Sequence, residues 1–231
     1  MSILLEGHTV RRFDGELNQV HLSVLELGGL ALDQWRVALE ALKADNLDAA
    51  RRVVAREDEV DGLQVALDAR ILALISRRAP VARDLRAVLA LSKCVADLER
   101  IGDLAAKVGH FVVDVHEGRE RRLPPVMVHD VFAMGRVVLA IVDDALLALD
   151  DFDRAVAEEV VRRHTDLDRL FRGCVRRITT VVLETPRLVG GAVAAVLLVK
   201  AVERAGDHAR NVADCLLRFN RDEVEEPSPA P

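Results

Sequence analysis

The sequence predicts an all-α fold made of two tandem three-helix bundles that are related by internal duplication. The phrase Glu99-Arg100-Ile101-Gly102-Asp103 returns as Glu203-Arg204-Ala205-Gly206-Asp207, at an offset of 104 residues in a chain of 231. Apolar residues recur at three- and four-residue spacing almost throughout, which is typical of amphipathic helices. Aromatic residues make up only 3% of the chain and tyrosine is absent, which favours helices over a β-sandwich or barrel.

Three helices are expected in the first repeat, residues 8–116. The first runs from about residue 8 to residue 42. The second runs to about residue 76, with Asp48 as its N-cap. The third begins at or just after Pro80, because proline is favoured at the first position of a helix, and it runs to about residue 116.

The pattern restarts in the second repeat, residues 126–219, after a linker at 117–125 that holds Gly118 and two prolines. Helices are expected at 126–149, at 154–183, and from a break at Pro186 to residue 219. Residues 150–153 mirror residues 45–48, so the two repeats share their first turn. Residues 220–231 hold three prolines and four acids and are expected to form a disordered tail.

Composition excludes several classes of protein. A formal net charge of −6 disfavours a nucleic-acid-binding protein, which usually carries a basic face. The longest uncharged apolar run, residues 188–199, is too short to span a bilayer, and charges interrupt any N-terminal signal peptide. Three cysteines without a C-x-x-C motif are typical of a reduced, cytoplasmic chain, and we expect them to fill the core.

The repeated phrase places two carboxylates at i and i+4 on one helix face, Glu99 with Asp103 and Glu203 with Asp207. Such pairs repel by about 0.2–0.5 kcal/mol, and a bridging cation would reverse the sign. Oxygen ligands favour hard cations such as magnesium or manganese, or carboxylate-bridged iron. We therefore predict a metal site in each repeat, with solvated surface charge as the alternative.

The glycine inside each copy of the phrase supports a special role for this part of the helix. A glycine within a helix costs roughly 1 kcal/mol relative to alanine. Gly102 and Gly206 occupy the same place in the two copies. Their recurrence indicates close packing of another helix or close approach of a ligand.

Acids on the middle helix of each repeat could complete the sites, since that helix runs antiparallel to the last one. Asp61 is the candidate in the first repeat. In the second repeat its counterpart is Asp166 at an offset of 105 or Asp168 at an offset of 107, and the spacing does not decide between them.

The position four residues after each pair differs between the repeats. Asn211 follows Asp207 and could add an oxygen ligand, whereas Lys107 takes the corresponding place after Asp103. The first site should therefore differ from the second. His110 lies in line with Glu99 and is a further possible ligand, although a surface histidine is the favoured interpretation.

Motifs of known catalytic sites are missing from the sequence. The chain has no Glu-x-x-His pair, which argues against a ferritin-like di-iron oxidase. It also has no G-x-S-x-G, P-loop, H-E-x-x-H or glycine-rich dinucleotide loop.

With its duplicated three-helix unit ending in E-R-x-G-D, the chain resembles the PhoU family of bacterial phosphate-uptake and phosphate-signalling regulators. Two further phrases carry the resemblance, Pro80-Val81-Ala82-Arg83-Asp84-Leu85-Arg86 and Asp207-His208-Ala209-Arg210-Asn211-Val212-Ala213. The likeness extends from about residue 8 to residue 219.

The resemblance implies a cytoplasmic, non-enzymatic regulator with metal-binding motifs at Glu99 and Asp103 and at Glu203 and Asp207, where the metal would be Mg, Mn, Fe or Zn. It implies binding to the phosphate transporter ATPase PstB and to the sensor histidine kinase PhoR, through which the protein would restrain phosphate uptake and the phosphate-starvation response. It also implies a homodimer that meets the membrane only through its partners.

Two departures from the pattern put the equivalence of the two sites in doubt. Leu188-Val189-Gly190 stands where Leu-Arg would echo the first repeat, and Lys107 stands opposite Asn211. Three alternatives stay open: a helical carboxylate-metal enzyme, a structural adaptor with solvated acids, and a PhoU-like regulator of another transporter.

Overall fold

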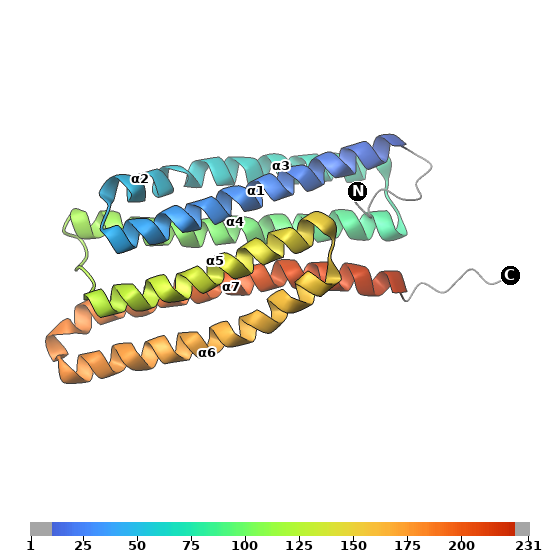
Figure 1. The fold of residues 1–231 in the computed structure, drawn as a ribbon. Coiled ribbons are helices and arrows are strands. Elements are labelled where there is room, and N and C mark those ends of the chain that lie inside the picture. Colours follow the sequence, from blue (N-terminus) through green and yellow to red (C-terminus); the bar gives the residue numbers. More distant parts are fainter. Residues whose placement is uncertain (1–10, 225–231) are drawn as a thin grey trace.

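The protein is all-α, as the sequence predicts, and its helices form two three-helix bundles that lie side by side (Figure 1). The structure is a computed structural model that describes residues 11–224, and no strand occurs within that range. The expected beginning of the first helix at residues 8–10 and the last part of the expected tail, 225–231, lie outside the described residues.

The first repeat contains α1 (Arg11–Ala44), a middle helix divided into α2 (Leu47–Ala55) and α3 (Glu57–Arg78), and α4 (Ala82–His116). One continuous helix from Asp48 to residue 76 was the wrong expectation, because the helix is interrupted at Arg56. The Arg56 guanidinium is paired there with Asp33 of α1. The N-cap is also Asn46 rather than Asp48, since the Asn46 side chain accepts a hydrogen bond from the Ala49 amide at 3.0 Å.

The second repeat contains α5 (Pro125–Asp151), α6 (Arg154–Glu184), the short 3₁₀ helix η2 (Pro186–Leu188) and α7 (Val189–Val224). Asp153 caps α6 by accepting hydrogen bonds from the amides of Ala155 and Val156 at 2.7 and 3.1 Å. Residues 220–224, expected to belong to a disordered tail, are the last part of α7. The acids that begin at Asp222 suggest an earlier end of the helix, whereas the prolines, which do break helices, begin only at Pro227.

The core runs through both repeats without a break. Trp35 of α1 is almost fully buried, and its indole N–H donates to the Ile101 carbonyl of α4 at 2.8 Å. Between the repeats, α4 packs against α7 and α1 packs against α5. Buried His21 of α1 is hydrogen-bonded through Nε2 to the Leu149 carbonyl of α5 at 2.9 Å. The two bundles therefore share one hydrophobic core.

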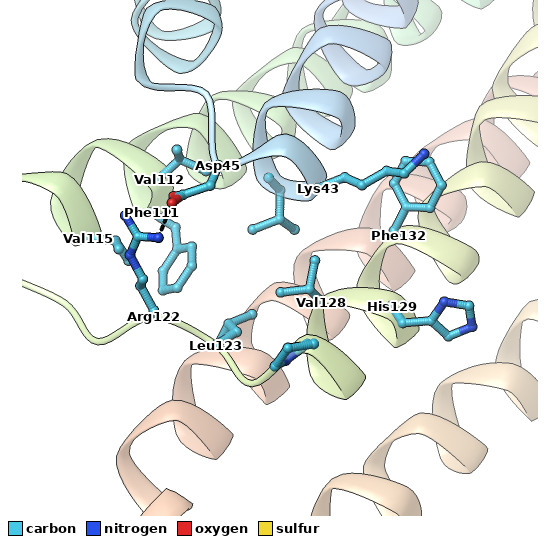
Figure 2. A pocket seen from close by; sticks show the side chains of 12 residues that line it. Lys43, Asp45, Phe111, Val112, Val115, Arg122, Leu123, Val128, His129 and Phe132 are labelled. Carbon is cyan, nitrogen blue, oxygen red and sulfur yellow. Dashed lines mark ion pairs between the residues drawn. The ribbon is translucent and has the colours of Figure 1, made fainter.

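A pocket of about 350 Å³ lies where α1 ends and α5 begins, beside the linker between the repeats (Figure 2). Its walls are mostly apolar and include Phe111. Its two cations already have partners within the protein: Arg122 pairs with Asp45, and the Lys43 ammonium lies 4.4 Å from the centre of the Phe132 ring. This pocket is separate from the acidic residues that the sequence singles out.

None of the helices among residues 11–224 is both long and apolar enough to cross a bilayer.

Candidate metal centre

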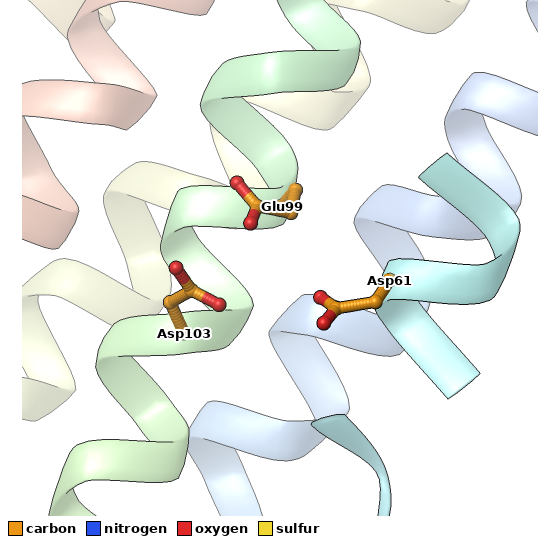
Figure 3. A group of neighbouring side chains, drawn as sticks. All are labelled: Asp61, Glu99 and Asp103. Atoms are coloured by element: carbon orange, nitrogen blue, oxygen red, sulfur yellow. The ribbon is translucent and has the colours of Figure 1, made fainter. Parts of the chain in front are cut away.

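Three carboxylates gather on the outer side of the first repeat, as the sequence predicts for Asp61, Glu99 and Asp103. Glu99 and Asp103 project from consecutive turns of α4, and Asp61 points toward them from α3 (Figure 3). One oxygen atom from each of the three lies within 4.8 Å of the others. Among the described residues this is the one such group of three that could hold a metal ion.

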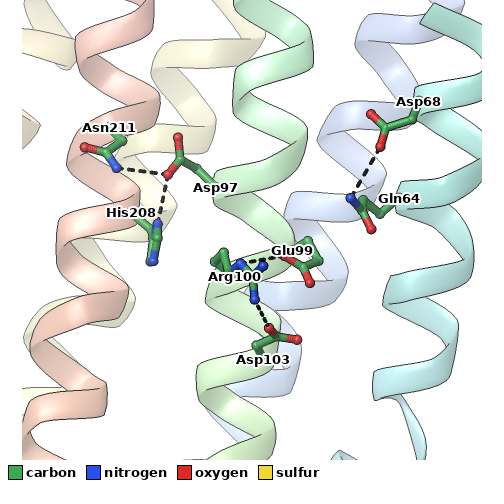
Figure 4. Close-up of polar contacts among 8 residues, drawn as sticks. All are labelled: Gln64, Asp68, Asp97, Glu99, Arg100, Asp103, His208 and Asn211. Carbon is green, nitrogen blue, oxygen red and sulfur yellow. Dashed lines mark hydrogen bonds and ion pairs between the residues drawn. The ribbon is translucent and has the colours of Figure 1, made fainter. Parts of the chain in front are cut away.

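The cluster carries more negative than positive charge. The pKa of Glu99 is raised, first because burial disfavours its charged form and then because Asp103 and Asp61 are negative neighbours. Arg100 offsets part of this repulsion, with its Nε 3.4 Å from Glu99 Oε2 and its Nη1 3.0 Å from Asp103 Oδ2 (Figure 4). The three carboxylates still outnumber the one guanidinium, and their oxygens suit a hard cation.

Gly102 lies between the two acids of α4 and allows close packing of the helices behind the cluster. A Cβ atom added at Gly102 would stand 3.2 Å from Val60 Cγ1 of α3 and 3.2 Å from Gln34 Oε1 of α1. The absence of a side chain thus lets α3 approach α4. This approach brings Asp61, next to Val60, within reach of Glu99.

The second copy of the phrase has a different environment. Glu203 is 9% exposed and pairs with Lys200 one turn earlier on α7. Asp207 Oδ1 lies 2.7 Å from Nε2 of the buried His164, which projects from α6. Each acid thus has a partner of its own. No third carboxylate of the described residues joins Glu203 and Asp207 at ligand distance.

The packing around Gly102 and Gly206 shows which residue of α6 corresponds to Asp61 of α3, a question that the sequence left open. A Cβ at Gly102 would meet Val60, and a Cβ at Gly206 would meet Leu167, 2.1 Å from its Cδ2. Val60 and Leu167 therefore correspond, at an offset of 107. The helix turns agree, since Asp45 and Phe152 both have positive φ and are also 107 residues apart, so the expected match of residues 150–153 with residues 45–48 was wrong by two residues. Asp168, not Asp166, is the counterpart of Asp61.

Neither of these two α6 acids completes a cluster with Glu203 and Asp207. Asp166 is exposed and pairs with Arg169 at 2.8 Å. Asp168 is half-buried, and its backbone carbonyl accepts a hydrogen bond from Arg172 at 3.3 Å. The register instead puts His164 in the place of Glu57, which in the first repeat lies 3.4 Å from His110 Nε2. His110 therefore contacts an acid of α3 on the exposed surface.

Asn211 turns away from Asp207 and toward the first repeat. Its Nδ2 donates to Asp97 Oδ1 of α4 at 2.9 Å, and His208 Nδ1 lies 2.8 Å from the same oxygen (Figure 4). Sequence reasoning missed Asp97, which joins the two repeats. The sequence offered one indication of a separate role for Asp97: it lies two residues before Glu99 and therefore on a different face of the helix.

Comparison with known proteins agrees with this architecture. The PhoU domain family matches the chain twice, over residues 24–112 and 131–216. A PhoU homolog of the phosphate-specific transport system of Pseudomonas aeruginosa is 32% identical over 94% of this chain and 88% of its own length. The corresponding accessory protein PhoU of Escherichia coli is 28% identical over 94% of this chain and 89% of its own length.

Solved structures give the same result. The crystal structure of PhoU from Pseudomonas aeruginosa superimposes with a TM-score of 0.83 at 32% identity, covering 90% of this chain and 99% of that one. A PhoU structure from Streptococcus pneumoniae shares the fold with a TM-score of 0.81 at 22% identity, covering 93% of this chain and 100% of that one. The duplicated phrase, the paired bundles and these likenesses over nearly the whole chain show that the protein belongs to the PhoU family.

Proposed function

We propose that this protein is a cytoplasmic accessory protein of a phosphate-specific transport system that binds the transporter ATPase PstB and the sensor histidine kinase PhoR. In this role it restrains phosphate uptake and the expression of phosphate-starvation genes when phosphate is plentiful. It acts by binding and not by catalysis. The observation that carries the proposal is the likeness, over 94% of the chain, to relatives named as accessory proteins of phosphate-specific transport.

We propose further that the cluster of Asp61, Glu99 and Asp103 holds a cation such as Mg²⁺, Mn²⁺, Zn²⁺ or an iron ion. The three oxygens within 4.8 Å support this assignment, and so does the raised pKa of Glu99, because a cation would offset both the burial and the negative neighbours that disfavour its charged form. The ion would turn a locally negative surface into a neutral or positive one. A partner's acidic residues could then complete its coordination.

Glu203 and Asp207, with Asp168 nearby in register, form a second and weaker candidate site. Lys200 and His164 already contact these acids. A cation there would have to displace or share both partners. We therefore assign the second repeat a lower affinity for metal.

A homodimer is part of the same proposal. Val189, Val193 and Leu197 recur at four-residue spacing on α7 and are 55%, 57% and 66% exposed. An apolar stripe of this kind on a helix surface is typical of protein–protein contacts. We expect Leu197→Glu to shift the protein from dimer to monomer in analytical ultracentrifugation.

The test of the proposed function is a binding measurement with purified PstB and with the cytoplasmic part of PhoR. Both are titrated against the wild-type chain in Mg²⁺ or Mn²⁺ and again in excess EDTA. The test variant is Asp61→Asn with Glu99→Gln and Asp103→Asn. The matched control neutralises three exposed acids elsewhere, Glu40→Gln, Asp68→Asn and Glu158→Gln.

We expect both partners to bind the wild type and the control, and binding to weaken in EDTA and in the test variant. Binding that persists in EDTA and in the test variant would support the accessory role and show that this role does not require a cation at the cluster. If neither partner bound the protein under any of these conditions, the proposed function would be contradicted. A regulator of another transporter would instead bind the ATPase encoded beside its own gene.

A further inference from the structure

Two of the three cysteines meet where the repeats join. Cys94 on α4 and Cys215 on α7 are 121 residues apart in sequence, yet their side chains lie close enough for each thiol to shift the pKa of the other. Both residues are buried, Cys94 completely and Cys215 with 5% of its surface exposed. The sequence predicts only that cysteines fill the core, and it gives no sign of this contact.

The two thiols have unequal surroundings. Arg218 lies one turn after Cys215 on α7, and its Nη2 is 3.6 Å from Cys215 Sγ. The pKa of Cys215 is lowered to about 6, first because Cys94 donates a hydrogen bond to its sulfur and also because Arg218 is positive, while burial and Asp97 oppose the shift. The pKa of Cys94 is raised well above its ordinary value by the same hydrogen bond and by burial.

A hollow between α4 and α7 gives access to one of the two sulfurs. It has a volume of about 580 Å³, and Cys215 and Arg218 line it together with Asp97, His208 and Asn211. Cys94 does not line it. A small polar oxidant can therefore approach Cys215 first, with Cys94 as the neighbouring second thiol.

We propose that Cys94 and Cys215 form an oxidisable dithiol that hydrogen peroxide closes to a disulfide, which links α4 to α7 and so joins the two repeats covalently. The inference rests on the contact of the two thiols, the adjacent guanidinium and the hollow. It is independent of the proposed function and of the metal cluster.

The reaction balances with one molecule of peroxide. The Cys215 thiolate attacks a peroxide oxygen, the O–O bond breaks, and the leaving hydroxide takes up a proton to form water, which leaves a sulfenic acid on Cys215. Cys94 Sγ then attacks the Cys215 sulfur, an S–S bond forms, and the S–O bond breaks. The departing hydroxide takes the proton of Cys94. Two thiols lose two electrons in all, and one peroxide becomes two waters.

Cys174 provides a matched control within the chain. It is also buried, and an arginine three residues later, Arg177, also contacts it, with Nη2 3.3 Å from Cys174 Sγ. It has no second thiol as a partner, and burial and Asp130 raise its pKa. A nearby arginine alone therefore does not lower the pKa of a buried cysteine in this protein.

The test treats the folded, full-length protein with hydrogen peroxide at pH 7, blocks free thiols with N-ethylmaleimide and maps tryptic peptides by mass spectrometry. Trypsin separates the cysteines into peptides 94–100, 173–176 and 211–218. Parallel samples contain dimedone, which traps sulfenic acids. The variants are Cys94→Ser, Cys215→Ser, Cys174→Ser and Arg218→Gln, each checked for wild-type helicity by circular dichroism.

We expect a crosslink between peptides 94–100 and 211–218 in the wild type and in Cys174→Ser. Cys94→Ser should accumulate a dimedone adduct on Cys215, and Cys215→Ser should leave Cys94 reduced. Cys215 should react roughly tenfold faster than Cys174, since only the thiolate is nucleophilic. Arg218→Gln, which keeps both thiols, should slow the reaction roughly fivefold.

Two results would overturn the proposal. One is a folded wild-type protein whose Cys94 and Cys215 both remain free under conditions that oxidise a small-molecule dithiol. The other is reaction of Cys215 and Cys174 at equal rates, or a crosslink that forms only in urea, because either would show that the native contact has no part in the chemistry.

Discussion

The two copies of the E-R-x-G-D phrase lie at the same place in two similar bundles, yet their carboxylates have different neighbours. In the first repeat Glu99 and Asp103 meet a third acid, Asp61, with Arg100 as the nearby cation. In the second repeat Glu203 pairs with Lys200, and Asp207 pairs with His164. The neighbouring helix, α3 or α6, and Lys200 on α7 itself thus decide whether the same motif presents an unbalanced acidic cluster or acids that each have a partner of their own.

This difference teaches that a duplicated motif does not imply a duplicated site. Helix geometry guarantees that residues at i and i+4 share a face, and both copies do so. The charge of the facing helix is free to change, because a surface pair contributes little to folding. We therefore infer that the first repeat keeps the stronger cation site.

The largest change in stability is expected from substitutions of the two motif glycines, which test how tightly the facing helix packs in each repeat. Gly206→Ala would push a methyl group to 2.1 Å from Leu167 Cδ2, whereas Gly102→Ala would meet Val60 and Gln34 only at 3.2 Å. Leu167 is fully buried and has little room to move. We expect Gly206→Ala to destabilise the protein by about 2 kcal/mol and Gly102→Ala to change stability by less than about 1 kcal/mol.

Urea unfolding followed by circular dichroism measures both values. Equal effects of the two substitutions would contradict the difference in packing between the repeats.

The next prediction concerns the ion pair of the second repeat. Glu203→Gln removes the charge that Lys200 faces in a largely buried position. We expect a loss of about 1 kcal/mol in the free energy of unfolding at pH 7. The matched variant Lys200→Gln should cost a similar amount, and the double variant should cost less than the sum of the two. Additive losses would mean that the pair does not interact.

Glu99→Gln should stabilise the metal-free protein at pH 7, whereas Glu203→Gln should destabilise it. The pKa of Glu99 is raised in the fold, so the native state holds its proton more tightly than the unfolded chain does. Stability should therefore fall as pH rises from the ordinary glutamate value through the raised one. Glu99→Gln should remove this slope and gain no more than about 1 kcal/mol at pH 7, because solvent screens the partly exposed cluster.

Thermal melts in EDTA between pH 4 and pH 8 measure this slope. A wild-type protein whose stability rises across that range relative to Glu99→Gln would contradict the raised pKa.

The smallest effect on stability is expected for Arg100→Gln. Arg100 is 59% exposed in its side chain, so its pairs with Glu99 and Asp103 should contribute less than about 0.5 kcal/mol. Its removal leaves the acidic cluster without its counter-ion. Divalent cations should therefore bind several-fold more tightly to this variant, as isothermal titration calorimetry would measure. Weaker binding would mean that Arg100 supports the site instead of competing with the metal.

Much of the architecture follows from local sequence patterns. Helical periodicity and the repeated phrase predict the paired bundles, and antiparallel packing predicts that Asp61 faces Glu99 and Asp103. The interruption at Arg56 was not predictable, because its neighbours are good helix formers and its pairing with Asp33 is a tertiary contact. The register of α6 became clear only from the contacts of Gly206 with Leu167.

Contacts between distant helices were the least predictable part of the site. Asn211 shares a helix face with Asp207 by sequence spacing, yet it bonds to Asp97 of the other repeat. The contact of Cys94 with Cys215 depends in the same way on how α4 packs against α7. Sequence spacing gives the face of a residue, whereas the partner on that face depends on tertiary packing.

The most direct test of the central claim is a titration of metal-free protein with Mn²⁺ by isothermal calorimetry, with bound metal then counted by elemental analysis. It compares the wild type with Asp61→Asn/Glu99→Gln/Asp103→Asn and with Glu203→Gln/Asp207→Asn. We predict one strong site in the wild type, which the first variant weakens by at least roughly tenfold and the second leaves intact. A strong site that survives in the first variant and disappears in the second, or no binding to the wild type, would contradict the account.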